Sequence, residues 1–288
     1  MSGEERQSKW RRAKSPDPLE LQPRDHEIVA AVHEFGFLAR DQIQQLFGFN
    51  CTTRANIRLR KLFDHGYLVR RFLPTALGSS KAVYFLGPQG IRLISEKRGI
   101  DPPVIKKRQK SCLGKKELFL DHDLMVNEVR ISFRRAFDNQ QDLRMDRWID
   151  PIGCLQKYTV FNPKLNRECK VIFRPDGYLR YFHNGKLFGC FLEVDRSTMS
   201  NARFQAKVKV YLDYAQSGLY QQRYGLKFFR VLVVTKTNER LINLKSATEK
   251  LTDKIFWFTT ADKLTANGVF DEIWEKPAKP GTFSLLRQ

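Results

Sequence analysis

The sequence predicts an α+β protein of two domains, a small helical domain followed by a larger domain built around a mixed sheet. Residues 25–98 pass from apolar positions at helical spacing to two short β-prone runs. Residues 101–117 then interrupt the pattern with two prolines and a series of lysines. Beyond them, β-prone runs and helical stretches alternate around one clear hairpin turn, Asn184-Gly185.

The charge of the chain indicates a polyanionic partner. Lysine and arginine number 51 against 31 acidic residues, a formal net charge of +20 over 288 residues. Nucleic acid is the commonest partner of this kind, and double-stranded DNA is the partner we expect. We expect no membrane partner and a cytoplasmic location, because no apolar run approaches the roughly 20 residues of a membrane span and the N-terminus lacks a signal peptide. The five cysteines are scattered and lack a C-x-x-C pair, which argues against a disulfide framework and a zinc finger.

Two basic segments flank the first domain. Residues 1–24 are rich in charge and proline and are predicted to form a flexible basic arm, which either reaches a phosphate backbone or only keeps the protein soluble. Residues 99–116, with Pro102-Pro103 and many lysines, are predicted to form a basic linker. The linker would either follow DNA between the domains or be merely solvated.

The order of elements in residues 25–98 is that of a winged helix-turn-helix domain. Helices are expected over residues 25–35, 41–47, 52–65 and 88–98, and strands over residues 67–72 and 82–86. Ile57, Leu59 and Leu62 are expected to hold the third helix on the other two. In such a domain the third helix enters the major groove of DNA and the hairpin, or wing, lies along the backbone.

The candidate DNA-binding residues lie on the third helix and on the wing. Arginine and asparagine near the start of a recognition helix can bond base edges, whereas basic residues of the wing are expected to meet phosphates. The candidates are Thr53, Arg54, Asn56, Arg58, Arg60 and Lys61 on the helix, with Arg70, Arg71 and Lys81 on the wing. The alternative is that these are solvated charges on a helical domain that binds protein.

The Asn184-Gly185 turn fixes the register of a hairpin in the second domain. With these two residues at the centre of the turn, counting outward places Asp176 directly opposite Glu193. Because alternate residues share a face, Asp176, Glu193 and Asp195 point to the same side of the sheet. Like charges that face each other across strands repel. A cation is therefore expected between them, either a divalent metal or an arginine or lysine side chain.

The remaining pattern predicts a restriction-endonuclease-like α/β domain over residues 117–288, with a mixed central sheet. A helix of about twenty residues follows the linker, and strands are expected at 145–149 and 168–173, the second leading into the hairpin. A helix over 200–215, a strand over 229–235, a helix over 241–251 and a strand over 254–258 complete it. Helix, strand meander, helix, strand is the element order of this fold.

Several motifs carry a resemblance to known proteins. They are the winged-helix start, the His122-x-Leu124-x-Val126-Asn127-Glu128 helix, Arg174-Pro175-Asp176, and Leu192-Glu193-Val194-Asp195-Arg196 followed by a helix with Lys207 and Tyr211. Together they resemble the replication-relaxation family of bacterial plasmids and other mobile elements. The resemblance implies a role in handling mobile-element DNA. Pro175-Asp176 with Glu193-x-Asp195 is also similar to the PD-(D/E)xK nuclease signature, in which two carboxylates hold a divalent metal.

The nuclease resemblance implies candidate catalytic residues and contains one departure. Asp176 and Glu193 would hold Mg²⁺ or Mn²⁺, and Glu128 would be the remaining acid. Asp195 stands where the signature has its lysine, so Lys207 of the following helix is the candidate substitute. The alternative is an inactive relic of the fold. In that case Lys207 only neutralises the carboxylates, and Asp195 forms a cross-strand ion pair with Arg174.

We therefore predict a DNA-binding protein of a plasmid or other mobile element, acting in replication or mobilisation or in their regulation. Replication or mobilisation proteins, and a second copy of the chain in a homodimer, are the candidate protein partners. One alternative is an endonuclease with Mg²⁺ or Mn²⁺ as its cofactor. A second alternative is a non-catalytic protein-interaction adaptor.

Overall fold

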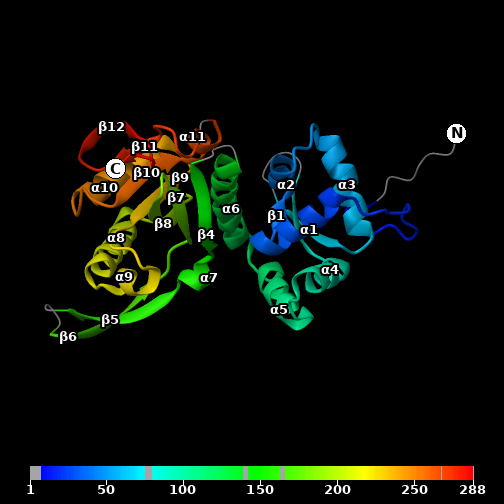
Figure 1. The fold of residues 1–288 in the computed structure, drawn as a ribbon, viewed down its shortest axis with the longest axis horizontal. Coiled ribbons are helices and arrows are strands. Elements are labelled where there is room, and N and C mark those ends of the chain that lie inside the picture. Colours follow the sequence, from blue (N-terminus) through cyan, green and yellow to red (C-terminus); the bar gives the residue numbers. More distant parts are fainter. Residues whose placement is uncertain (1–7, 75–79, 139–141, 163–165, 267, 288) are drawn as a thin grey trace. The chain divides into compact units, whose positions relative to one another are not determined.

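The computed structural model describes residues 8–74, 80–138, 142–162, 166–266 and 268–287 (Figure 1). The fold is a mixed α+β one, and the chain divides into two units, Met1–Glu128 and Val129–Gln288. The boundary between them falls within one long helix, α6 (Glu117–Asp138).

The first unit contains the helices and strands that the sequence predicts, in the predicted order. A three-stranded sheet of order β1-β3-β2 accompanies its helices. The elements are α1 (Pro23–Phe35), β1 (Leu38–Ala39), α2 (Arg40–Leu46), α3 (Thr52–Asp64), β2 (Leu68–Leu73), β3 (Lys81–Leu86), α4 (Pro88–Arg98) and α5 (Pro102–Leu113). Leu59 and Leu62 of α3 are fully buried, but Ile57, expected beside them, is 56% exposed. Ala55 and Phe63 are buried on α3 instead, because the apolar stripe starts two residues earlier.

The predicted linker is not a linker, because it contains α5. Ile105, Gln109 and Cys112 are buried on one face of this helix. The Gln109 amide accepts a hydrogen bond from the Leu86 backbone N–H and donates one to the Gly36 carbonyl, both at 3.1 Å. The stripe has helical spacing, but the lysines around it conceal it in the sequence.

The predicted flexible arm is also held in place where it is described. Residues 8–22 lie against α3: Arg12 Nε donates to the Phe63 carbonyl at 2.8 Å, and the Ala13 N–H donates to Asp64 Oδ1 at 3.0 Å. Arg60 of α3 donates to the Ser8 carbonyl at 2.6 Å. Residues 1–7 lie outside the described part. Apart from the Trp10 ring, which packs against Phe72, the arm is held largely by hydrogen bonds, which no apolar periodicity could reveal.

The second unit is built around a seven-stranded mixed sheet, in which only the pairs β8–β9 and β9–β10 are parallel. In sheet order the strands are β12 (Lys279–Phe283), β11 (Trp274–Lys276), β10 (Phe256–Thr260), β9 (Arg230–Thr235), β8 (Lys186–Asp195), β7 (Gly177–His183) and β4 (Leu143–Ile149). The helices are α7 (Pro151–Cys154), α8 (Asn201–Gln216), α9 (Leu219–Tyr224), α10 (Asn238–Glu249) and α11 (Ala261–Ala266). The two parallel connections run through α8 with α9 and through α10, as expected for crossovers between parallel strands.

Two further strands, β5 (Gln156–Asn162) and β6 (Arg167–Phe173), form a separate two-stranded ribbon. The strand expected at 168–173 therefore exists and leads along the chain into the hairpin, but its partner is β5.

The hairpin of β7 and β8 has the predicted register. His183 pairs with Lys186, and the pairing continues to Gly177 opposite Leu192. Asn184 and Gly185 adopt φ angles of 48° and 73°, the positive values that a two-residue type I′ turn requires. The Asp176 N–H donates to the Leu192 carbonyl at 2.9 Å, which extends the register to the acidic residues.

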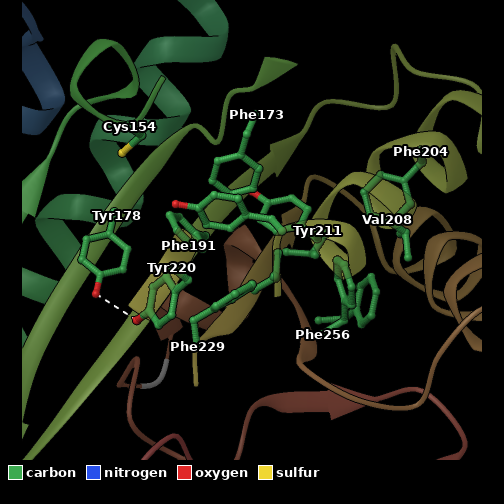
Figure 2. Packing of buried hydrophobic residues seen from close by; sticks show 14 of the residues in the cluster. Cys154, Phe173, Tyr178, Phe191, Phe204, Val208, Tyr211, Tyr220, Phe229 and Phe256 are labelled. Atoms are coloured by element: carbon green, nitrogen blue, oxygen red, sulfur yellow. Dashed lines mark hydrogen bonds between the residues drawn. The ribbon is translucent and has the colours of Figure 1, made fainter. Parts of the chain in front are cut away.

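Aromatic rings fill the space between the sheet and the helices α8, α9 and α10 (Figure 2). Phe191 of β8 lies at the centre, with the rings of Phe173, Tyr178 and Phe229 at centroid distances of 5.0 Å. The hydroxyl groups of Tyr178 and Tyr220 are 3.0 Å apart and hydrogen-bonded, which satisfies two buried polar groups within the core. This packing fixes α8 against β8.

The first testable prediction concerns the attachment of α3 to α1. Arg58 Nε donates to Asp25 Oδ1 at 2.7 Å, and the Asp25 side chain is fully buried. Arg58→Ala leaves a buried carboxylate without its cation, so we expect the free energy of unfolding to fall by about 3 kcal/mol. Arg54→Ala on the exposed face of α3 is the control. Urea unfolding of both variants checks this, and equal stabilities would show that the ion pair does not hold the helices together.

Candidate nucleic-acid interface and acidic cluster

A basic hollow of about 570 Å³ opens in the first unit beside α3 and the hairpin of β2 and β3. Its basic lining residues are Lys9, Arg40, Arg60, Arg70 and Lys81. Thr52, Asn56 and Ser80 add hydroxyl and amide groups, and Asp41 is its one acidic lining residue. Asp41 is already paired with Arg40 at 2.6 Å. The hollow therefore offers many hydrogen-bond donors and a net positive charge to a ligand.

Arg70 of β2 is the most informative residue of the hollow. Its guanidinium group lies over the Phe63 ring, 4.2 Å from the ring centroid. Nε and Nη2 are buried, and among the described residues neither has a hydrogen-bond acceptor. Burial lowers the pKa of Arg70, and the nearby Arg60 lowers it further. Tyr84 provides one side-chain hydrogen bond to the guanidinium group, but buried N–H groups without acceptors are costly, so an anion bound in the hollow would stabilise Arg70.

The structure brings only some of the predicted DNA-binding residues to this hollow. Asn56, Arg60, Arg70 and Lys81 line it. Lys61 lines a smaller hollow of about 330 Å³ on the side of α3 that faces the arm.

Thr53 and Arg54 are exposed on α3 but do not line either hollow. They remain available to a ligand that lies along the exposed face of the helix.

Two predicted residues are committed to the fold. Arg58 is paired with Asp25, and Arg71 Nη1 donates to the Lys115 carbonyl at 2.8 Å. Arg60 lines the hollow but is also held, because its Nε donates to Asp64 Oδ2 at 2.6 Å. These contacts argue against base readout by Arg58 and against phosphate binding by Arg71.

Sequence reasoning missed Arg40 as a site residue. Leu38 and Ala39 pair with Tyr84 and Val83 of β3, which brings the next residue to the hairpin. The two-residue strand is too short to show alternation in the sequence, so no signal pointed to this position.

The second candidate site is an acidic cluster where β8 meets α8. Glu193, 4% exposed, accepts hydrogen bonds from the Lys207 ammonium group and the Tyr211 hydroxyl. Lys207 and Tyr211 are four residues apart and therefore share one face of α8. Asp176 directly precedes the neighbouring strand β7, and its Oδ2 accepts from the Val194 N–H at 2.9 Å. The cation expected between the carboxylates is thus the Lys207 side chain.

The acid–base properties of the cluster are set by burial. Burial raises the pKa of Glu193 to about 7, and the negative charge of Asp176 contributes, while Lys207 opposes the rise. The pKa of Lys207 is raised, because the charges of Glu193 and Asp176 outweigh the effect of its burial. Burial also raises the pKa of Tyr211 well above its ordinary value. Glu193 is therefore the group of the cluster that titrates near neutral pH.

Asp195 is not part of the acidic cluster, and the predicted ion pair between Asp195 and Arg174 is wrong. Arg240 of α10 donates to Asp195 from Nε at 2.8 Å and from Nη2 at 3.1 Å. The cross-strand pair with Arg174 is thus replaced by a bidentate pair with a helix that follows 45 residues later. The β7–β8 pairing begins at Gly177. Arg174 lies before the paired residues, so the hairpin does not hold it opposite Asp195.

Glu128 lies in the first unit. There Gln42 Nε2 donates to its Oε2 at 3.1 Å and to the Leu124 carbonyl at 2.7 Å. These contacts tie the side chain to α2, and its predicted role as a third acid is not supported by them.

The acidic cluster does not fit a resident divalent cation in this conformation. Both carboxylate oxygens of Glu193 already accept hydrogen bonds, from Lys207 and Tyr211. Within the described part of the chain, no three histidine, cysteine, aspartate or glutamate side chains come together as a metal site. Hard divalent cations require several oxygen ligands, and two carboxylates held by other groups do not supply them.

Comparison with known proteins places both sites within one family. A family model described as replication-relaxation matches residues 29–230, more than half of the chain. The chain belongs to the replication-relaxation family. The matched residues run from α1 to the start of β9, so this replication-relaxation protein carries both the basic hollow and the acidic cluster largely within its family region.

Solved structures add little to the family assignment. Two chains of the restriction endonuclease FokI, the second bound to DNA, match with 13% and 12% identity and TM-scores of 0.30 and 0.28. The matches cover 84% and 86% of this chain but only 43% and 45% of those chains. Likeness at this level does not establish a shared fold. No curated protein matches the chain.

Across the described residues, every helix is too short or too polar to cross a membrane.

The second testable prediction is a pH dependence of stability. Because the pKa of Glu193 in the folded protein, about 7, lies above its ordinary value of 4.5, the folded state holds this proton more tightly than the unfolded state. The stability that this proton supplies is present below pH 4.5 and is lost as the pH rises toward 7. Glu193→Gln removes this titrating group. As the pH rises through this range, we expect the natural protein to lose on the order of 3 kcal/mol of unfolding free energy relative to the variant.

Urea unfolding at several pH values between about 4.5 and 8 measures this difference. Glu239→Gln, at an exposed position in the first turn of α10, is the control. Parallel stability curves for the natural protein and Glu193→Gln would contradict the raised pKa.

Proposed function

We propose that this replication-relaxation protein binds duplex DNA of a plasmid or other mobile element during replication or mobilisation, through a winged-helix domain formed by α1 to α4. The observation that carries the proposal is the basic hollow beside α3 and the hairpin, with Arg70 in its wall, whose Nε and Nη2 have no acceptor among the described residues. The second unit, from Val129 onward, is a nuclease-like domain in this proposal.

The geometry of the first unit supports duplex binding. Thr53, Arg54 and Asn56 are exposed on the N-terminal half of α3, the part of a recognition helix that meets base edges. Lys81 at the start of β3 is also exposed. With α3 in the major groove, the hollow would face the DNA backbone. A phosphate in the hollow would then accept hydrogen bonds from the N–H groups of Arg70 that have no acceptor.

Ion pairs within the first unit reduce the number of α3 side chains that can contact base edges. Arg58 and Arg60 form ion pairs with Asp25 and Asp64. Arg54 and Asn56 therefore remain as the side chains near the start of the helix that can bond base edges. A bidentate contact between arginine and guanine contributes about 1–3 kcal/mol of discrimination. Arg54 is therefore the residue we expect to set sequence preference.

A protein-interaction adaptor fits these observations less well. Interfaces between proteins are depleted in lysine and charge at their centres, whereas the hollow has five basic lining residues. The adaptor function would also leave the N–H groups of Arg70 that lack an acceptor unexplained.

The third testable prediction compares two double variants of equal charge. Arg40→Ala with Lys81→Ala removes two cations from the hollow, and Arg92→Ala with Lys97→Ala removes two exposed cations from α4. We expect only the hollow variant to lower the slope of log affinity against log salt concentration, by about 2, because each lost phosphate contact removes roughly one released counterion.

Fluorescence anisotropy with labelled duplex DNA at several salt concentrations measures the slope. If both double variants lose affinity equally, the effect is one of overall charge and the hollow is not the binding site.

Metal-dependent cleavage of DNA is a second candidate function, and one observation favours it. Asp176, Glu193 and Lys207 come together as the nuclease signature with a displaced lysine requires. The engaged oxygens of Glu193 count against it, so we rank it below DNA binding.

The fourth testable prediction separates these two functions. Supercoiled and linear DNA are incubated with the protein and Mg²⁺ or Mn²⁺, beside Glu193→Gln and Lys207→Met. We expect DNA to be bound and left intact by all three proteins. Cleavage by the natural protein that disappears in both variants, with binding retained, would instead make the acidic cluster an active site.

A further inference from the structure

The β5–β6 ribbon is a conspicuous element of the second unit that the proposed function does not use. Seven consecutive residue pairs join its strands, from Gln156 opposite Phe173 to Asn162 opposite Arg167. The ribbon extends away from the seven-stranded sheet of its unit (Figure 1) and is not hydrogen-bonded to it. A two-stranded ribbon is marginally stable by itself, so its persistence depends on anchoring at one end.

The anchored end of the ribbon is well defined. The Phe173 ring stacks on Tyr214 of α8 with centroids 4.0 Å apart and an interplanar angle of 11°. Gln156 Oε1 accepts hydrogen bonds from the Tyr214 hydroxyl at 2.9 Å and from Arg223 Nη1 at 3.0 Å. Tyr158 reaches the Val210 carbonyl at 3.4 Å. These contacts fix the direction in which the ribbon leaves the domain.

The two faces of the ribbon differ in exposure. Because paired residues share a face, one face carries Gln156, Tyr158, Val160, Cys169, Val171 and Phe173, all of them buried or half-buried, and at its far end Arg167, which is exposed. The other face, which we call the outer face, carries Lys157, Thr159, Phe161, Glu168, Lys170 and Ile172, all of them exposed. Phe161 and Ile172 are 58% and 59% exposed. Large apolar side chains exposed on a bare strand favour association, so the outer face is suited to a partner.

We propose that the outer face of the β5–β6 ribbon is a second DNA-binding element that lies in a groove of duplex DNA. Its charge favours a polyanion, because Lys157 and Lys170 outnumber Glu168 on this face. The proposal rests on the proposed function only in taking duplex DNA as the ligand. It concerns a different unit of the chain.

The dimensions of DNA agree with this assignment. The major groove of B-DNA, about 12 Å wide, admits a two-stranded β-ribbon. In that position the lysines reach phosphates at the edges of the groove, and Thr159 can hydrogen-bond base edges. Phe161 supplies the apolar contact that a thymine methyl group accepts. One face therefore combines the side chains for affinity with those for base contact.

Two double variants of the second unit test the role of the charges. Lys157→Ala with Lys170→Ala removes the lysines of the outer face, and Lys209→Ala with Lys250→Ala removes two exposed lysines elsewhere in the unit. We expect the ribbon variant alone to lower the salt slope of duplex binding, by about 2. Equal slopes for the two double variants would overturn the proposal. All four positions are exposed, and matching thermal unfolding curves verify that the folds are intact.

Thiol protection locates the bound DNA on each unit separately. Cys51 is exposed directly before α3, and Thr159→Cys introduces a thiol on the outer face. Maleimide labelling of both positions, followed by mass spectrometry of peptides, is compared with and without duplex DNA. We expect both thiols to be labelled at least tenfold more slowly in the complex.

The two thiols distinguish failure of this proposal from failure of the proposed function. Protection of Cys51 without protection at position 159 overturns the role of the ribbon and leaves the winged-helix proposal standing. Protection at position 159 alone supports the ribbon and overturns DNA binding by the first unit. Equal protection at position 159 by polyglutamate, an acidic polypeptide, would show that the ribbon takes acidic proteins and would also overturn the proposal.

Discussion

The Asn184-Gly185 turn is the constraint on which the second unit depends. Its two positive φ angles fix which residues of β7 and β8 face each other, and β8 lies inside the sheet between β7 and β9. A slip of one residue would reverse the two faces of the strand. Phe191 would leave the aromatic core, and Glu193 would lose Lys207 and Tyr211. The turn thus determines the core and the acidic cluster together.

Burial of Glu193 then dictates how the cluster can behave. A carboxylate beside Asp176 and removed from water needs a cation, and α8 supplies one in Lys207, with the Tyr211 hydroxyl on the other oxygen. The same ammonium group cannot neutralise Glu193 and at the same time approach a phosphate. Asp195 is removed from the cluster by its bidentate pair with Arg240. The cluster is thus internally satisfied, which is the arrangement of a structural element more than of an open active site.

The sequence predicted features whose cause is local. The helices α1 to α4 follow from apolar spacing, and the facing of Asp176 and Glu193 follows from a two-residue turn. Features that depend on distant partners were not predictable. The partner of Arg58 lies 33 residues away, and Arg240, the partner of Asp195, lies 45 residues away. The buried stripe of α5 consists of only Ile105, Gln109 and Cys112 among many lysines, so its apolar periodicity is weak.

The cations of the chain fall into two groups, those paired within the fold and those left on exposed surfaces. A net charge of +20 is not itself a binding site, because many of its cations, such as Arg12 and Arg58, satisfy groups within the fold. The acidic cluster is neutralised by Lys207, which removes negative potential that would repel a phosphate backbone. Many other cations stay exposed, Arg92 and Lys209 among them, and those of the hollow and the outer face are set apart only by the side chains around them. Two buried N–H groups of Arg70 have no acceptor among the described residues, so an outside anion would be stabilised in the hollow, and the proposed DNA ligand carries one at every nucleotide.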